Sequence, residues 1–104
     1  MITYDIPKEM QAVVLTGPGR FEFTTVPTPS PVDDEVLCRV HAVAICGTDP
    51  KIVKGAFAGT WPRSYPAIIG HEWAGEVVAL GPDVAASPRL AAKWAPGVRV
   101  AGES

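Results

Sequence analysis

Eleven prolines and ten glycines divide this chain of 104 residues into short apolar segments. Proline removes a backbone donor and glycine weakens helices and strands, so the interruptions favour short strands joined by turns over long helices. A chain of 104 residues has material for one domain. With 47% hydrophobic and 19% charged residues, its composition is typical of a soluble, mainly β domain.

Runs of β-branched and aromatic residues predict where the strands lie. Residues 11–15 and 21–26 form two short candidates on either side of a turn at residues 17–19. Residues 73–80 alternate as a further strand, followed by a turn at residues 81–83. The alanine-rich stretch at 85–94 predicts a short helix and residues 97–100 a last strand. The expected fold is therefore mainly β, with one or two short helices.

The longest strand candidate covers residues 35–45. By its two-residue period, one face would carry Val36, Cys38, Val40, Ala42 and Ala44. His41 falls on the other face, where a solvated or hydrogen-bonded side chain is favoured over a metal ligand. Cys38 is interpreted as a small buried apolar residue. An extended strand would hold Cys38 and Cys46 about 26 Å apart, too far for a disulfide, so both thiols should be free.

Two short motifs concentrate the reactive groups: Cys46-Gly47-Thr48-Asp49 and Gly70-His71-Glu72. Cysteine, histidine and carboxylate side chains are ligands of Zn²⁺, and three of them leave a fourth position open in a catalytic site. A cysteine and a histidine taken singly are more often core residues. His71 and Glu72 are adjacent, so both can reach one metal only if the chain bends at Gly70.

A short helix is predicted directly after Cys46. Thr48 or Asp49 serves as its N-cap, Pro50 takes the first helical position, and Gly55 ends it. A helix N-terminus next to Cys46 favours the thiolate, which is the form that binds metal. On these grounds Asp49 is as well explained by capping as by a functional role.

In this order, the strand 35–45, the Cys-Gly-Thr-Asp motif, residues 66–72 and residues 75–84 resemble the medium-chain dehydrogenase/reductase family. The similarity is to its zinc-dependent alcohol and polyol dehydrogenase branch and covers about residues 11–101. It implies a GroES-like, partly open β-barrel over residues 1–104. It also implies an NAD(P)-binding Rossmann domain, which this chain lacks. The resemblance further allows a homo-oligomer.

The resemblance also implies roles for individual residues. Cys46 and His71 hold Zn²⁺, Glu72 binds it directly as in polyol dehydrogenases, and Asp49 orients the imidazole of His71. Thr48 accepts the proton of an alcohol or polyol substrate while a nicotinamide, NAD(P), takes the hydride.

Three further expectations concern the edges of this site. The third protein ligand of many relatives lies beyond Ser104, and Glu103 is a candidate substitute. Lys51 stands where many relatives carry a relay histidine. Trp61 and Tyr65 could line a substrate cleft or cover the barrel, and covering is favoured because large loop aromatics usually pack on something.

Charge and hydropathy argue against two classes of partner. The net charge is −2 and no cluster of Lys and Arg is present, so neither nucleic acid nor an anionic membrane surface is expected. No apolar stretch approaches the roughly 20 residues that span a bilayer, and residues 1–9 do not resemble a signal peptide. A cytoplasmic location is therefore expected.

Two other interpretations stay open. The chain could be a free-standing GroES-like module that binds a metal or a partner protein without redox chemistry. It could also be a structural fragment in which Cys46 and His71 bind no metal. Metal content distinguishes both from a dehydrogenase domain, and a fragment without a nicotinamide-binding domain is predicted to be inactive alone.

Overall fold

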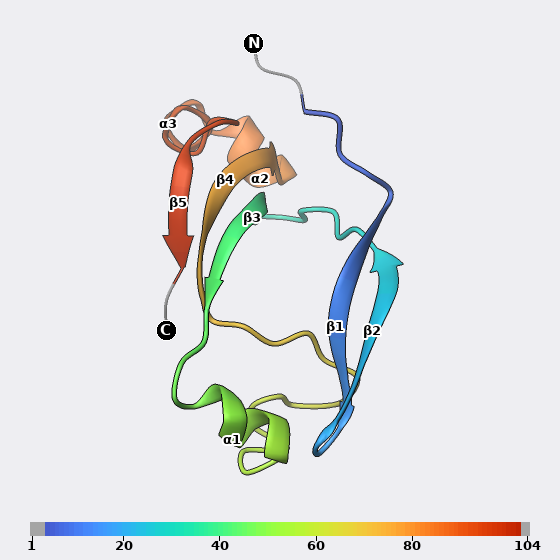
Figure 1. Cartoon of the computed structure of the whole chain (residues 1–104). Helices are drawn as coiled ribbons and strands as arrows, with labels where there is room; N and C mark the ends of the chain where they lie inside the picture. The colour runs from blue at the N-terminus through green and yellow to red at the C-terminus, as the bar shows by residue number, and fades with distance from the viewer. Residues whose placement is uncertain (1–3, 103–104) are drawn as a thin grey trace.

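The computed structural model describes residues 4–102, which form two small antiparallel sheets (Figure 1). One sheet pairs β1 (Glu9–Gly17) with β2 (Arg20–Pro27). The other has the order β3 (Val36–Ala44), β4 (Glu72–Leu80) and β5 (Arg99–Gly102). The sheets do not close into a barrel, which confirms a mainly β, partly open fold. No helix of residues 4–102 is long and apolar enough to cross a membrane.

The β1–β2 hairpin confirms the turn predicted at residues 17–19. Gly19 has a φ of +68°, a left-handed conformation that glycine adopts at no steric cost. The N–H of Gly19 donates to the carbonyl of Val53 at 2.6 Å, and Leu15 exchanges two backbone hydrogen bonds with Ala67. The hairpin tip is thereby anchored to the segment between β3 and β4, which carries most of the predicted site.

Strand β3 differs from the simple alternation that the sequence predicts. Its pairing with β4 shifts register between Leu37 and Cys38 and again between Val40 and Ala42. The first shift places the extra residue, Val78, in β4, and the second places the extra residue, His41, in β3, so the alternation of β3 is interrupted after Val40. Val40 is also 51% exposed, and the single apolar face predicted for this strand is wrong. Cys38 and Cys46 are both free thiols, as predicted.

Helix α1 (Asp49–Lys54) forms where it was predicted, with Thr48 at the N-cap and proline in the first turn. Gly55 ends it with a φ of +89°. A Cβ at Gly55 would lie 2.8 Å from a side-chain carbon of Pro18, so the hairpin tip packs closely against the helix end. Ile52 of α1 is fully buried. The helix thus fixes the chain that follows Cys46.

The segment after β4 contains two helices, α2 (Pro82–Ala86) and α3 (Pro88–Lys93). The turn predicted at residues 81–83 is wrong, because Gly81 caps α2 and Pro82 begins it. The helix predicted at 85–94 is divided at Ser87, whose hydroxyl accepts the N–H of Leu90 at 3.3 Å and starts α3. The last strand begins at Arg99 rather than at residue 97. Glu103, the candidate extra ligand, lies outside the described residues.

Candidate metal centre

The end of β3 and the start of β4 bring the two reactive motifs together. Ala44 pairs with Glu72 in the β3–β4 ladder, and Cys46 follows β3 by two residues. One potential ligand atom from each of Cys46, His71 and Glu72 lies within 4.8 Å of the others. Gly70 makes the expected bend, with a φ of +131° that a side chain would disfavour. A thiol, an imidazole and a carboxylate therefore converge on one point.

Asp49 stands behind this cluster and touches both motifs. One carboxylate oxygen, Oδ2, accepts the backbone N–H of Cys46 at 2.8 Å. The other, Oδ1, lies 3.4 Å from Nδ1 of His71, and both of these atoms are buried without a hydrogen-bond partner. Nδ1 thus faces a carboxylate, which leaves Nε2 as the ring nitrogen available to a metal.

These residues fit a zinc ion. Zinc prefers thiolate, imidazole and carboxylate ligands, and a metal-binding histidine usually donates its second N–H to a carboxylate or carbonyl. The orphaned pair of Nδ1 and Asp49 Oδ1 matches that arrangement, since a ring proton on Nδ1 would satisfy both atoms. The donor set and its carboxylate support both lie within residues 46–72.

Hydrogen bonds also stabilise the thiolate form of Cys46, which is the form that binds metal. The hydroxyl of Thr48 donates to Sγ of Cys46 at 3.4 Å. This bond, followed by the Thr48 backbone N–H and the His71 imidazole, lowers the pKa of Cys46 below its ordinary value. The pKa of His71 is raised, mainly by the same hydrogen bond to Cys46. The lowered pKa of Cys46 therefore favours the metal-binding thiolate.

The loop after α1 brings the ring of Trp61 against His71, a contact that the sequence did not assign to the site. The rings of Trp61 and His71 are 4.9 Å apart between centroids and inclined by 61°, an edge-to-face contact. Trp61 therefore packs on the imidazole of a candidate ligand rather than on the barrel alone. No local sequence signal pairs a loop tryptophan with a histidine ten residues later, because the contact depends on how the loop folds back.

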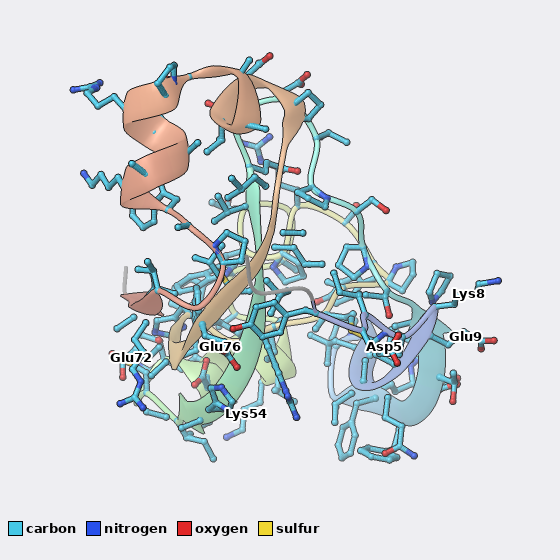
Figure 2. The ribbon with its side chains drawn as sticks, turned by 90° about the horizontal axis from the view of Figure 1, so that it is seen from above. Asp5, Lys8, Glu9, Lys54, Glu72 and Glu76 are labelled. Atoms are coloured by element: carbon cyan, nitrogen blue, oxygen red, sulfur yellow. The ribbon has the colours of Figure 1, made fainter. Side chains whose placement is uncertain are left out.

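His41 stays outside the cluster, as the sequence predicted. Its Nε2 lies 3.1 Å from Oε1 of Glu76, and the hydroxyl of Tyr4 donates to the other oxygen of Glu76 at 2.9 Å. Glu72 and Glu76 both belong to β4 and are labelled in Figure 2. Burial raises the pKa of the Cys38 thiol, which suits the apolar role predicted for it.

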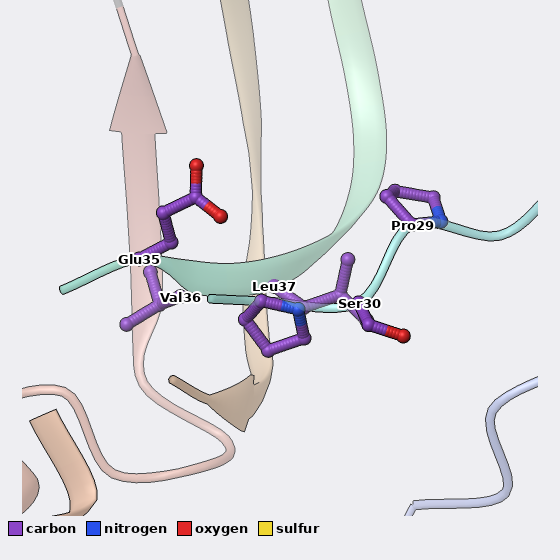
Figure 3. Close-up of a pocket in the computed structure, with 6 residues that line it drawn as sticks. Pro29, Ser30, Glu35, Val36 and Leu37 are labelled. Carbon is purple, nitrogen blue, oxygen red and sulfur yellow. The ribbon is translucent and has the colours of Figure 1, made fainter. Parts of the chain in front are cut away.

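Two hollows on the surface differ in whether residues of the cluster line them. The one in Figure 3 has a volume of about 410 Å³ and lies between the proline-rich linker and the start of β3. None of the cluster residues lines it. Another, of about 370 Å³, is bordered by Glu72 together with Val43 and Trp73. Glu72 is the one residue of the cluster that borders this shallow hollow.

Comparisons with known proteins agree with this geometry. The alcohol dehydrogenase GroES-like domain family matches residues 32–104. Sorbitol dehydrogenase of Bacillus subtilis is 37% identical over 83 residues, which are 80% of this chain and 24% of that protein. A zinc-binding alcohol dehydrogenase domain-containing protein of Emericella nidulans is 38% identical over 84 residues, with 81% and 24% covered.

A solved structure shows the same fold. The crystal structure of a short chain alcohol dehydrogenase from E. coli CFT073, complexed with the cofactor NADH, matches with a TM-score of 0.71 and 30% identity. The match covers 91% of this chain and 24% of that one. The chain thus spans about a quarter of the length of the relatives it matches. The resemblance inferred from the motifs is confirmed, and the chain belongs to the alcohol dehydrogenase GroES-like domain family of zinc-type medium-chain dehydrogenases.

Proposed function

We propose that this chain is the zinc-binding catalytic domain of an NAD(P)-linked alcohol or polyol dehydrogenase. The observation that carries the proposal is the convergence of Cys46, His71 and Glu72 within 4.8 Å. Three protein ligands are what a catalytic zinc site uses, with the fourth position open to water or substrate. The carboxylate of Glu72 supplies the third ligand inside this chain, so no ligand from beyond Ser104 is needed.

Each residue of the site has a chemical role in this proposal. A zinc ion bound there would polarise the oxygen of the substrate as a Lewis acid. Asp49 holds the Nδ1 side of His71 and, through the backbone of Cys46, the thiolate as well. The hydroxyl of Thr48, beside Sγ of Cys46, accepts the proton of the substrate alcohol and passes it toward solvent.

The hydride acceptor binds elsewhere in the parent protein. The relative from E. coli carries NADH, and this chain corresponds to about a quarter of that structure. We therefore place the nicotinamide on a Rossmann domain that is not among these 104 residues. In the parent enzyme the Rossmann domain would face the hollow beside Glu72.

The substrate class follows from the same reasoning. Sorbitol dehydrogenase of Bacillus subtilis is among the relatives, and the resemblance implies that Glu72 binds zinc directly as in polyol dehydrogenases, so a small alcohol or polyol is the proposed substrate. Both thiols are free, which suits the reducing cytoplasm. The parent enzyme is also proposed to be a homo-oligomer.

The test is the zinc content of the purified chain by mass spectrometry. We expect about one zinc ion per chain in the wild type, lost in Cys46→Ser and in His71→Ala. Cys38→Ser and His41→Ala are matched controls, because they change the same residue types outside the cluster and should keep the metal. Asp49→Asn should keep the fold but bind zinc about tenfold more weakly, since it removes the carboxylate behind the imidazole.

The opposite results would be decisive. A wild-type chain that remains free of zinc after zinc is added back would contradict the proposed metal centre. Loss of zinc in the Cys38 or His41 variants, with Cys46→Ser still loaded, would place the site elsewhere in the fold.

A further inference from the structure

Asp49 approaches the His71 ring at a single atom, Nδ1. The nearest polar atom, Oδ1 of Asp49, is 3.4 Å away, and neither atom has a hydrogen-bond partner. The residue before it is Gly70, which has no side chain and adopts a φ of +131°. The His71 side chain is only 10% exposed, and its contacts with Asp49 and Cys46 are made through polar atoms, so the ring itself packs against a further group.

That group is the indole of Trp61. The two rings meet at 61° with their centroids 4.9 Å apart, which is within the range preferred for edge-to-face aromatic pairs. Asp49 approaches the imidazole at one ring nitrogen, whereas Trp61 packs against the ring itself. A contact of this kind opposes rotation of the imidazole about its bond to Cβ, because rotation would separate the rings.

The position of Trp61 is itself fixed by its loop. Its backbone N–H donates to the carbonyl of Phe57 at 2.8 Å, and Gly59 donates to the carbonyl of Pro62 at 3.0 Å. Pro62, the next residue, is buried. The loop also continues directly from α1, whose first residue is Asp49. One helix therefore presents His71 with a carboxylate from its first residue and an aromatic ring from the loop after its end.

We propose that Trp61 is a positioning residue for the metal centre: its indole fixes the plane of the His71 imidazole so that Nε2 points to the site shared with Cys46 and Glu72. Trp61 does not bind the metal, since the indole nitrogen is a donor only. The inference rests on the proposed zinc centre and adds a residue to it. Its role is to hold the ligand ready before the metal arrives, which lowers the ordering cost of binding.

The experiment measures Zn²⁺ affinity of the chain by competition with a chromophoric chelator. Trp61→Leu keeps apolar bulk but removes the ring, and should weaken Zn²⁺ binding about fivefold, the effect expected from losing one aromatic pair. Trp61→Phe keeps an aromatic ring and should restore most of the affinity. Trp94→Leu is the matched control, because Trp94 lies after α3 and contacts Lys93 rather than the cluster.

A second readout separates positioning from general destabilisation. With Co²⁺ in place of zinc, the visible absorption bands report ligand geometry, and we expect them to broaden in Trp61→Leu but not in Trp94→Leu. Urea unfolding of the metal-free variants shows whether each is folded. If Trp61→Leu does not fold, Trp61→Phe and Trp61→Tyr are compared with wild type, and ring-retaining variants should keep the wild-type bands.

The outcomes are distinguishable. If wild type binds zinc and a folded Trp61→Leu binds it equally tightly with unchanged cobalt bands, the positioning role is wrong while the metal centre stands. If wild type itself binds neither Zn²⁺ nor Co²⁺, the metal centre and the inference built on it both fail.

Discussion

Asp49 shows how a single carboxylate can serve two parts of the site. The residues alone left capping and a functional role as equal explanations, and the family resemblance shifted the balance to orienting His71. In the structure Thr48 is the N-cap and makes no side-chain capping bond, while Asp49 accepts the N–H of Cys46, three residues earlier. Its second oxygen is directed at His71. Asp49 therefore braces the chain just before the helix and stands beside the imidazole, so neither explanation was sufficient alone.

Glu76 gives a prediction on pH dependence. The hydroxyl of Tyr4, and after it the imidazole of His41, lower the pKa of Glu76 below its ordinary value of about 4.5. A carboxyl whose pKa is depressed in the folded state adds stability above its unfolded pKa and loses it as pH falls through the folded pKa. Glu76→Gln should therefore be less stable than wild type at neutral pH, and the difference should shrink and disappear as pH falls from the ordinary carboxyl range through the lowered pKa of Glu76.

Thermal unfolding at a series of pH values measures this difference. Glu22→Gln is the control, because Glu22 is exposed on β2 and makes no side-chain hydrogen bond or ion pair within residues 4–102. A constant gap between wild type and Glu76→Gln across the whole pH range would show that the ionised carboxylate is not the cause.

At the scale of elements, the pairing of β3 with β4 decides where the site forms. The two strands are antiparallel, so the end of one meets the start of the other, and the cluster occupies that corner. The strands pass unusually close at Gly75, where a Cβ would lie 2.1 Å from the carbonyl oxygen of Arg39. Glycine is needed here because of contact with backbone, which cannot move aside as a side chain can.

Gly75→Ala should therefore destabilise the domain. Overpacking of a close contact costs about 1–3 kcal/mol, and here the strands must separate to admit a methyl group. Urea unfolding measures the change in free energy. Gly47→Ala is the control, because a Cβ at Gly47 meets nothing within 4 Å and its φ lies outside the left-handed region. Equal stability of the two variants would mean that β3 and β4 are not tightly apposed at Gly75.

The elements also show which features can be predicted from sequence. The hairpin, α1 and the β4 strand follow local signals: a glycine-proline turn, a proline-to-glycine helix frame and a period of two. The register shifts in β3 and the division of α2 from α3 do not, since they depend on cross-strand packing and on the capping of α3 by Ser87. Likewise Cys46, His71 and Glu72 are recognisable from their motifs, whereas the contact of Trp61 with His71 requires the folded loop.

For the whole molecule, the main feature is a small interior beside a large apolar surface. Among the described residues, the buried apolar side chains are Pro62 and four core residues, Leu15, Ile52, Val77 and Val84. Large apolar residues are exposed along β2 and β3, including Phe23 at 71% and Ile45, just before Cys46, at 85%. So many exposed large apolar side chains in so small a domain are the kind of surface that other parts of a protein cover. This pattern supports the proposal that further parts of the parent enzyme pack against the domain.

The same proposal predicts that the chain alone has no dehydrogenase activity. Incubated with zinc, sorbitol and either NAD⁺ or NADP⁺, it should produce no reduced nicotinamide above the background, because no residue of this domain is proposed to bind the dinucleotide. A sorbitol dehydrogenase of full length serves as the positive control. Turnover by the chain that disappears in Cys46→Ser would contradict the division of labour between two domains.

Cys46 and His71 stand at the two ends of a loop of about 25 residues that contains α1 and the Trp61 segment. An ion held by both side chains would act as a crosslink across this loop, much as a disulfide does. By the chain-entropy relation, closing a loop of about 25 residues removes about 3.5 kcal/mol of freedom from the unfolded chain. The catalytic ion would then also serve as a clasp, so that stripping it loosens the protein at the very corner where the chemistry takes place.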